Sequence, residues 1–274
     1  MKFIYSIPAL SILLSAVNAS PIDLPPVFKR DLDLSLTQSQ CTSSGSQVSC
    51  STSGSSGSDS CCVESEGLIL QTQFWDTDVS GSPENTWTIH GLWPDKCDGS
   101  YDANCDFSSQ VSSVSDVLQN AGETDLVNYM SQYWLNNNGD NEELWTHEFN
   151  KHGTCMSTLG TQCYASGTAS NTNVVDFAKL VVKTYQGLPT YQWLAKAGIT
   201  PSSSKTYSAD EISAALKAGF GNDVFIGCSN GAFNQVWYFH TVQGSLLNDD
   251  LVKIDAVSKS TCSGHVKYLP RQSN

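Results

Sequence analysis

The first periodic segments of the chain have the pattern of β-strands. Residues 67–75 (GLILQTQFW) and 87–93 (WTIHGLW) are rich in β-branched and aromatic side chains, and a stretch with Gly, Ser and Pro separates them. Runs of this kind, bounded by turn residues, are typical of strands. We expect the two segments to form neighbouring central strands of one sheet.

In the middle of the chain, apolar residues recur every three to four positions, the period of a helix that buries one face. Later, Ser208 and Glu211 form a Ser-x-x-Glu box, which satisfies free backbone donors where a helix begins. We therefore predict a helix over 211–220. Four further helices are predicted from the period alone, over residues 112–123, 123–135, 143–155 and 172–188.

The last third returns to strand-like runs at 223–228, 235–242 and 251–257, with turn residues at 230–231 and 248–250. The connections between these runs are too short for crossover helices, which indicates antiparallel pairing. Strands, then helices, then strands predict an α+β fold with a central antiparallel β-sheet and packed helices.

The first 30 residues have the composition of targeting and processing sequence. A positively charged start, a short apolar stretch and an A-x-A-like cleavage site predict a signal peptide over residues 1–19. The apolar stretch is too short to span a bilayer. The Pro-rich residues 20–30 end in Lys29-Arg30, which predicts a propeptide; the alternative is that this pair is merely solvated charge. One catalytic domain then accounts for residues 31–274.

Ten cysteines, an even number, follow the predicted signal peptide. They indicate disulfide bridges and an oxidising, extracytoplasmic environment. Residues 42–60 have the Ser/Gly composition of a flexible linker, but the cysteines in and around them predict a stapled loop. No pair has the C-x₂-C spacing of a zinc site, and the adjacent Cys61 and Cys62 do not easily share tetrahedral coordination. We expect a disulfide-stapled single domain without structural zinc.

The charge balance excludes a protein that coats or stores RNA. The chain has 14 basic and 27 acidic residues; without Lys2, Lys29, Arg30 and Asp23, residues 31–274 keep 11 and 26, a net charge of −15. A stable complex with RNA usually rests on a basic footprint. An enzyme needs cationic groups at only one phosphate, so any contact with RNA is expected to be local and transient.

Histidines are concentrated in two short aromatic-rich segments. Of five histidines, His90 lies in WTIHGLWP (87–94), and His147 and His152 lie in WTHEFNKHGTC (145–155). A single histidine in an aromatic strand is more often a hydrogen-bonded core residue. Three of five in two segments indicate a shared site.

A helix over the second segment gathers polar side chains on one side, because successive residues are 100° apart. Trp145 and Phe149, four residues apart, form an apolar strip that anchors this helix against the sheet. The polar side chains, each about one turn or less from the next, are His147, Glu148, Lys151 and His152.

This pattern disfavours a zinc hydrolase and suits chemistry without a metal. A metalloprotease helix carries H-E-x-x-H, but H-E-F-N-K-H places its histidines five apart, about 140° around the helix. Two imidazoles, a carboxylate and a lysine suit cleavage of RNA by its own 2′-hydroxyl, in which one group takes a proton and another donates one to the leaving 5′-oxygen. Histidine has an ordinary pKa of about 6.5, which suits both tasks. We expect no metal and no cofactor.

Together the two segments resemble those of the ribonuclease T2 family, H-G-L-W-P and H-E-x-x-K-H-G-T-C, both matched without a gap. The resemblance implies that His90 is the general base toward the 2′-hydroxyl and His152 the general acid on the leaving oxygen, with the roles reversed when water opens the 2′,3′-cyclic phosphate. Glu148 and Lys151 would stabilise the pentacoordinate phosphate. His147 would hold the phosphate or substrate in register.

The resemblance also places base recognition at Trp93, Asp95 and Tyr101, where stacking on an aromatic face suits unpaired bases. Each has a structural alternative: Trp93 as packing, Asp95 as a turn residue and Tyr101 as a merely exposed ring. Leu144 stands where related enzymes can carry the aromatic ring of a second base site. It offers apolar contact but little stacking, so we expect broad cleavage with a modest base preference.

The family's cysteine order implies five bridges, a pairing that the spacing alone leaves open. They are Cys41–Cys62, Cys50–Cys97, Cys61–Cys163, Cys105–Cys155 and Cys228–Cys262.

The chain is thus expected to be a secreted or vacuolar/lysosomal, monomeric endoribonuclease with no membrane partner. It would cleave single-stranded RNA to 2′,3′-cyclic phosphates and then to 3′-phosphates. One rival is a catalytically weak relative that acts as a cytotoxin or as a binding or signalling protein, which should have lost a histidine. Another is a metal-dependent phosphodiesterase that also cleaves DNA, which should carry a carboxylate cluster.

The excess of acidic over basic residues predicts that the pKa values of the two catalytic histidines, His90 and His152, are raised. Activity is then expected to be optimal below about pH 6.

Overall fold

The structure is a computed structural model, and it describes residues 32–35, 47–51 and 59–272. The expected signal peptide (1–19) and propeptide (20–30) lie outside the described residues. The strands are β1 (Leu68–Phe74), β2 (Thr88–Asp95), β3 (Thr206–Ser208), β4 (Phe225–Ser229), β5 (Ala232–Val242), β6 (Leu251–Lys253) and β7 (His265–Lys267). The α-helices are α1 (Val114–Asn120), α2 (Thr124–Tyr133), α3 (Asn141–Lys151), α4 (Thr172–Gln186), α5 (Thr190–Lys196) and α6 (Ala209–Phe220).

All seven described strands form one sheet, in the order β2-β1-β5-β7-β3, with β4 and β6 also paired to β5. Every pairing is antiparallel except a single parallel contact between β5 and β7. The prediction of an α+β fold with a central, essentially antiparallel sheet is therefore confirmed. β1 and β2 are neighbours as expected, but the prediction that both are central is wrong, because β2 pairs only with β1. On its free edge, the His90 carbonyl accepts a hydrogen bond from the indole of Trp134, the residue that follows α2.

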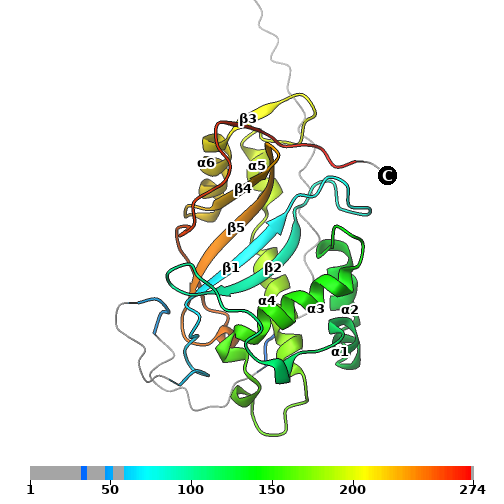
Figure 1. Ribbon diagram of the computed structural model, residues 1–274, viewed down its shortest axis with the longest axis vertical. Helices are drawn as coiled ribbons and strands as arrows, with labels where there is room; N and C mark the ends of the chain where they lie inside the picture. The colour runs from blue at the N-terminus through cyan, green and yellow to red at the C-terminus, as the bar shows by residue number, and fades with distance from the viewer. Residues whose placement is uncertain (1–31, 36–46, 52–58, 273–274) are drawn as a thin grey trace, which may run out of the picture.

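The helices divide into two groups along the sheet. Figure 1 shows α1, α2 and α3 gathered beside β2, and α5 and α6 near β4 at the other end. The predicted helix over 143–155 ends at Lys151, and residues 153–155 form a separate 3₁₀ turn. The capping box is present, with Ser208 accepting from the Glu211 amide and the Glu211 side chain accepting from Ser208. The predictions missed three short elements: α5, β3 and β7.

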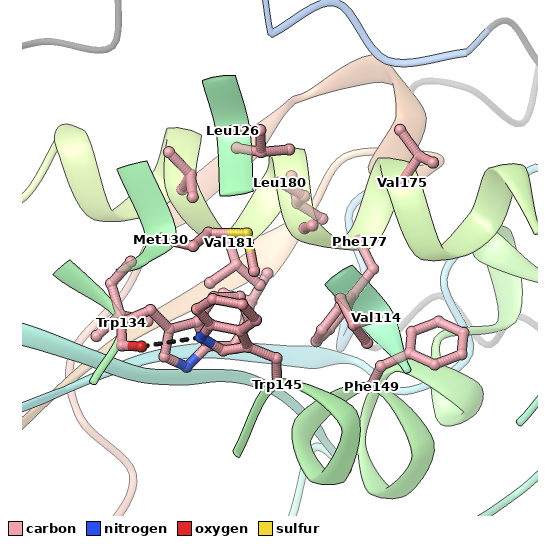
Figure 2. Packing of buried hydrophobic residues seen from close by; sticks show 14 of the residues in the cluster. Val114, Leu126, Met130, Trp134, Trp145, Phe149, Val175, Phe177, Leu180 and Val181 are labelled. Atoms are coloured by element: carbon pink, nitrogen blue, oxygen red, sulfur yellow. Dashed lines mark hydrogen bonds between the residues drawn. The ribbon is translucent and has the colours of Figure 1, made fainter. Parts of the chain in front are cut away.

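The apolar core lies on both faces of β1, whose side chains alternate between them. Ile69 belongs to a large cluster with α1–α4, whereas Leu68 and Leu70 pack with Phe225 and Phe239 on the opposite face. Figure 2 shows the large cluster, in which the Trp145 indole donates a 2.8 Å hydrogen bond to the Trp134 carbonyl. Trp145 and Phe149 are both buried there, as the predicted apolar strip requires.

Disulfides connect the loops to this framework. Cys41 lies outside the described residues, as does much of the predicted stapled loop at 42–60, so the pair Cys41–Cys62 stays a prediction. The other four expected bridges are confirmed: Cys50–Cys97, Cys61–Cys163, Cys105–Cys155 and Cys228–Cys262.

No helix within the described ranges is long and apolar enough to cross a membrane.

Candidate active site

His90 stands at a β-bulge in the edge strand β2. Thr72 of β1 pairs with Gly91 and Gln73 with Ile89, so the residue between them has no partner in the register. Such an extra residue bends the strand and re-aims its side chain. The free His90 carbonyl accepts a 2.7 Å bond from the Trp134 indole of the segment that follows α2. The imidazole is stacked on Phe74, with ring centroids 3.9 Å apart.

The last turn of α3 supplies the other polar groups. Asp140 caps the start of the helix by accepting from the Glu143 amide at 3.0 Å. Buried Phe149 fixes the rotation of the helix, so that Glu148, only 1% exposed, faces the sheet. His152 is the C-cap, with φ −109° and ψ −48°, and is also buried. The Cys105–Cys155 bridge ties down the following turn.

Glu148 is the centre of the arrangement. One carboxyl oxygen, Oε1, lies 3.5 Å from His90 Nε2, and the other, Oε2, accepts a 2.8 Å bond from Trp93 Nε1. The Trp93 ring stacks on His152 at 5.2 Å between centroids and meets His90 edge-on at 4.7 Å. Two imidazoles thus lie against one indole ring and beside one buried carboxyl group. The Nδ1 atoms of both imidazoles are buried and have no hydrogen-bond partner within the described part of the chain.

Burial dominates the protonation of these groups. It lowers the pKa of His90 to about 3, and the charges of His147 and Lys151 add to the shift. It lowers the pKa of His152 to about 3, where Lys151 is the largest of the charges that act in the same direction. It raises the pKa of Glu148 to about 8, against the hydrogen bond from Trp93. The expectation that net negative charge raises both histidine pKa values is wrong, because local desolvation outweighs distant, screened charge.

His147 and Lys151 complete the site on its open side. His147 is exposed, and its ring centroid lies 6.4 Å from that of His152. Burial, then the charge of Lys151, lowers the pKa of His147. The Lys151 ammonium lies 5.9 Å from the Tyr101 ring centroid. His147 and the Lys151 ammonium therefore lie at the mouth, and the two buried imidazoles lie behind them.

Residues 66–259 match the model of the ribonuclease T2 family. The chain belongs to the ribonuclease T2 family. It is 46% identical to ribonuclease T2 of Aspergillus oryzae over 78% of this chain and 79% of that protein, and 44% identical to ribonuclease T2-like 1-A of Candida albicans over 82% and 58%. The chain thus spans little more than half of the longer Candida protein. Its fold is similar to that of Actibind, a T2 ribonuclease of solved structure, with a TM-score of 0.79 and 40% identity over 85% of this chain and 98% of Actibind. Its enzyme class is that of a T2-type endoribonuclease.

The four residues that the resemblance to the ribonuclease T2 family assigns to base recognition differ in how far they are buried. Trp93 is half-buried and its ring packs on His152, so packing accounts for it without a base. Asp95 ends β2 and is buried; burial, then the charge of Glu66, raises its pKa to about 7. Tyr101 is 58% exposed and its centroid lies 6.5 Å from that of His152. Leu144 is half-buried against the large cluster. Their role in binding a base stays a prediction.

The same site contains a group of side chains that could bind a cation. One group within the described ranges could hold a metal ion: single ligand atoms of His147, Glu148 and His152 all lie within 4.8 Å of one another. Ligand atoms of the two histidines thus approach each other although the residues are five positions apart along the chain.

Three residues that shape the candidate active site were not predicted from the sequence. Phe74 stacks on His90, and Trp134 holds its carbonyl. Gly91 leaves room for Glu148, since a Cβ atom there would lie 1.9 Å from Glu148 Oε2. The glycine of H-G-L-W-P was a visible signal for a close approach of another group. No local pattern relates Phe74 or Trp134 to His90, because both contacts depend on tertiary packing.

Proposed function

We propose that this T2-type endoribonuclease is secreted and cleaves single-stranded RNA through the RNA's own 2′-hydroxyl, without a metal ion. The observation that carries the proposal is the placement of His90 and His152 against the Trp93 indole, with Glu148 between the strand and the helix that provide them. Two imidazoles on one site provide the base and the acid that an in-line displacement at phosphorus needs.

In the first step, an unprotonated nitrogen of His90 takes the proton of the 2′-hydroxyl. The 2′-oxygen forms a bond to phosphorus, and the bond from phosphorus to the 5′-oxygen breaks. His152 gives its proton to that 5′-oxygen, and the product is a 2′,3′-cyclic phosphate. The low pKa of His90 keeps it unprotonated in mildly acidic solution. A bound phosphodiester anion opposes the loss of the proton from His152.

In the second step the roles reverse. His152 takes a proton from water, whose oxygen bonds to phosphorus; the bond to the 2′-oxygen breaks, and His90 returns the proton to it. The product is a 3′-phosphate. Lys151 stabilises the charge that develops on the phosphorane oxygens. Glu148, with its pKa raised to about 8, is protonated below that pH and donates a hydrogen bond to the same oxygens instead of repelling them. His147 contacts the phosphate at the mouth.

Metal independence is tested by cleavage in EDTA. We expect RNA to be cleaved to fragments with 2′,3′-cyclic phosphate ends in EDTA, and DNA, which has no 2′-hydroxyl, to stay intact. We expect His90→Ala and His152→Ala each to lower kcat/KM by about 10²–10⁴-fold. His265→Ala is the matched control, because His265 is exposed on β7. Loss of activity in EDTA, or an intact rate in His152→Ala, would contradict the mechanism.

The processing steps belong to the same proposal. A chain cut after residue 19 and again after Lys29-Arg30 enters the medium or a vacuole as a monomer that starts at Asp31. Sequencing the N-terminus of the secreted protein tests the second cut, and a start at Ser20 would exclude it. Light scattering on the purified enzyme tests the monomer.

A further inference from the structure

A hollow of about 600 Å³ continues from the catalytic site along α3. His147 and Lys151 line it, so it opens onto the groups at the mouth of the site. Its opposite wall comes from the loop before α1, with Asn104, Gln110 and Ser112. The volume lies in the range of pockets that bind small ligands or parts of larger ones. We call this hollow the α3 groove.

The two walls of the α3 groove are held together at several points. The Asn104 amide donates to the Lys151 carbonyl at 2.9 Å. The Asn150 side chain accepts from the Val111 amide at 2.9 Å and donates to the Val111 carbonyl at 2.8 Å. The Cys105–Cys155 bridge crosses nearby. The groove is thus formed before any ligand binds, which lowers the entropic cost of binding.

The charges along the groove run from basic to acidic. His147 and Lys151 lie at the catalytic end, and the lining also contains Asp140, Glu142 and Glu143. These carboxylates accept hydrogen bonds, and none of them donates when ionised. A phosphate is therefore favoured at the basic end. The acidic part favours exocyclic amino groups, which donate hydrogen bonds and which adenine, cytosine and guanine have but uracil lacks.

We propose that the α3 groove binds one further nucleotide of the RNA strand, outside the pair that flanks the scissile phosphate, and prefers a base with an exocyclic amino group. This inference rests on the proposed function. The groove shares His147 and Lys151 with the site, so a strand that has its scissile phosphate at these residues can continue into it. The phosphate of the additional nucleotide stays near Lys151, and its base reaches the acidic wall at Glu143.

The experiment compares kcat/KM for a dinucleoside phosphate with kcat/KM for trinucleotides extended by one adenosine or one uridine, on the 5′ or the 3′ side. We expect adenosine on one side to raise kcat/KM about tenfold, the effect of about 1.4 kcal/mol, and uridine to raise it less. Ser112→Trp fills the groove with an indole ring from an exposed position. We expect the trinucleotide-to-dinucleotide ratio to fall toward one in this variant.

Two further variants make the result specific. Gln132→Trp adds the same ring at an exposed position of α2 outside the groove and should keep the ratio of the wild type. Glu143→Gln replaces an acceptor-only group by an amide and should narrow the preference for adenosine over uridine. Circular dichroism and Tm verify that each variant is folded.

The outcomes separate this inference from the proposed function. If the enzyme cleaves neither the dinucleotide nor the trinucleotides, the proposed function fails. If it cleaves the dinucleotide but extension brings no gain, or if the gain survives in Ser112→Trp, the groove proposal alone is overturned. An unchanged adenosine preference in Glu143→Gln overturns the assignment of the base.

Discussion

Gly91 is the residue whose missing side chain matters most for the site. A Cβ atom there would lie 1.9 Å from Glu148 Oε2 and 3.0 Å from Trp93 Nε1. We expect Gly91→Ala to displace the carboxyl group and to lower kcat/KM about 10²-fold, because small misplacements of catalytic groups have effects of that size. Gly187→Ala is the control, since a Cβ atom there meets only a carbonyl oxygen at 3.4 Å. A Gly91→Ala enzyme with wild-type kcat/KM would show that Glu148 need not lie there.

The protonation of His90 and His152 determines how activity depends on pH. The first step needs His90 unprotonated and His152 protonated. Because burial lowers both pKa values to about 3, the protonated fraction of His152 in the free enzyme rises as the pH falls through the acidic range. We therefore expect kcat/KM to be maximal below about pH 6, because the two histidines are buried and not because the chain has a negative net charge. A kcat/KM profile on a dinucleoside phosphate that is highest above pH 7 would contradict this assignment.

At the scale of elements, the connection between β1 and β2 is held by the C-terminal segment. The Arg271 guanidinium donates to the carbonyls of Asp76, Pro83 and Thr86 and lies 4.1 Å from the Trp75 ring centroid. Removing it leaves these groups without a partner, so we expect Arg271→Gln to lower the free energy of unfolding by about 3 kcal/mol. Urea unfolding measures this change.

The same substitution should leave catalysis nearly unchanged. His90 is positioned by Phe74 and Trp134, whereas Arg271 contacts the carbonyls of the β1–β2 connection and the Trp75 ring. We expect kcat/KM of Arg271→Gln within about twofold of the wild type at a temperature where the variant is folded, since distant sites act independently. Lys259→Gln, at an exposed lysine, provides the control for loss of charge. A large loss of activity without a loss of stability would mean that the connection positions the site.

Elements with a strong local pattern could be predicted, and those defined by tertiary contacts could not. The capping box at Ser208 and the β-branched and aromatic composition of residues 67–75 need only neighbouring residues to be recognised. The edge position of β2 and the bulge at His90 depend on which strand lies on the other side and on Trp134 covering the edge. The identities of the candidate catalytic residues followed from two motifs, but their burial, and with it the direction of their pKa shifts, required the folded chain.

Across the whole molecule, buried carboxyl groups and buried histidines govern how stability depends on pH. Burial raises the pKa of Glu148 from 4.5 to about 8 and that of Asp95 from 3.8 to about 7. The contribution of these carboxyl groups to stability is fully present below their pKa values in the unfolded chain. It is lost as the pH rises through their pKa values in the folded protein. Burial lowers the pKa of His90 and His152 from 6.5 to about 3 and that of His240 to about 4. Their contribution is present above 6.5 and is lost as the pH falls toward these values.

The two trends oppose each other, so stability should be highest between about pH 4.5 and 6.5 and fall on either side. The net charge of residues 31–274 adds repulsion on the alkaline side. Calorimetric Tm values from pH 3 to 9 test this, and Glu148→Gln should lose less Tm between pH 6 and 8 than the wild type, because its amide does not ionise. A Tm that rises steadily from pH 5 to 8 would mean that the buried carboxyl groups ionise in the folded protein without cost. The enzyme is thus expected to be most stable in the acidic range in which its histidine pair is expected to be active.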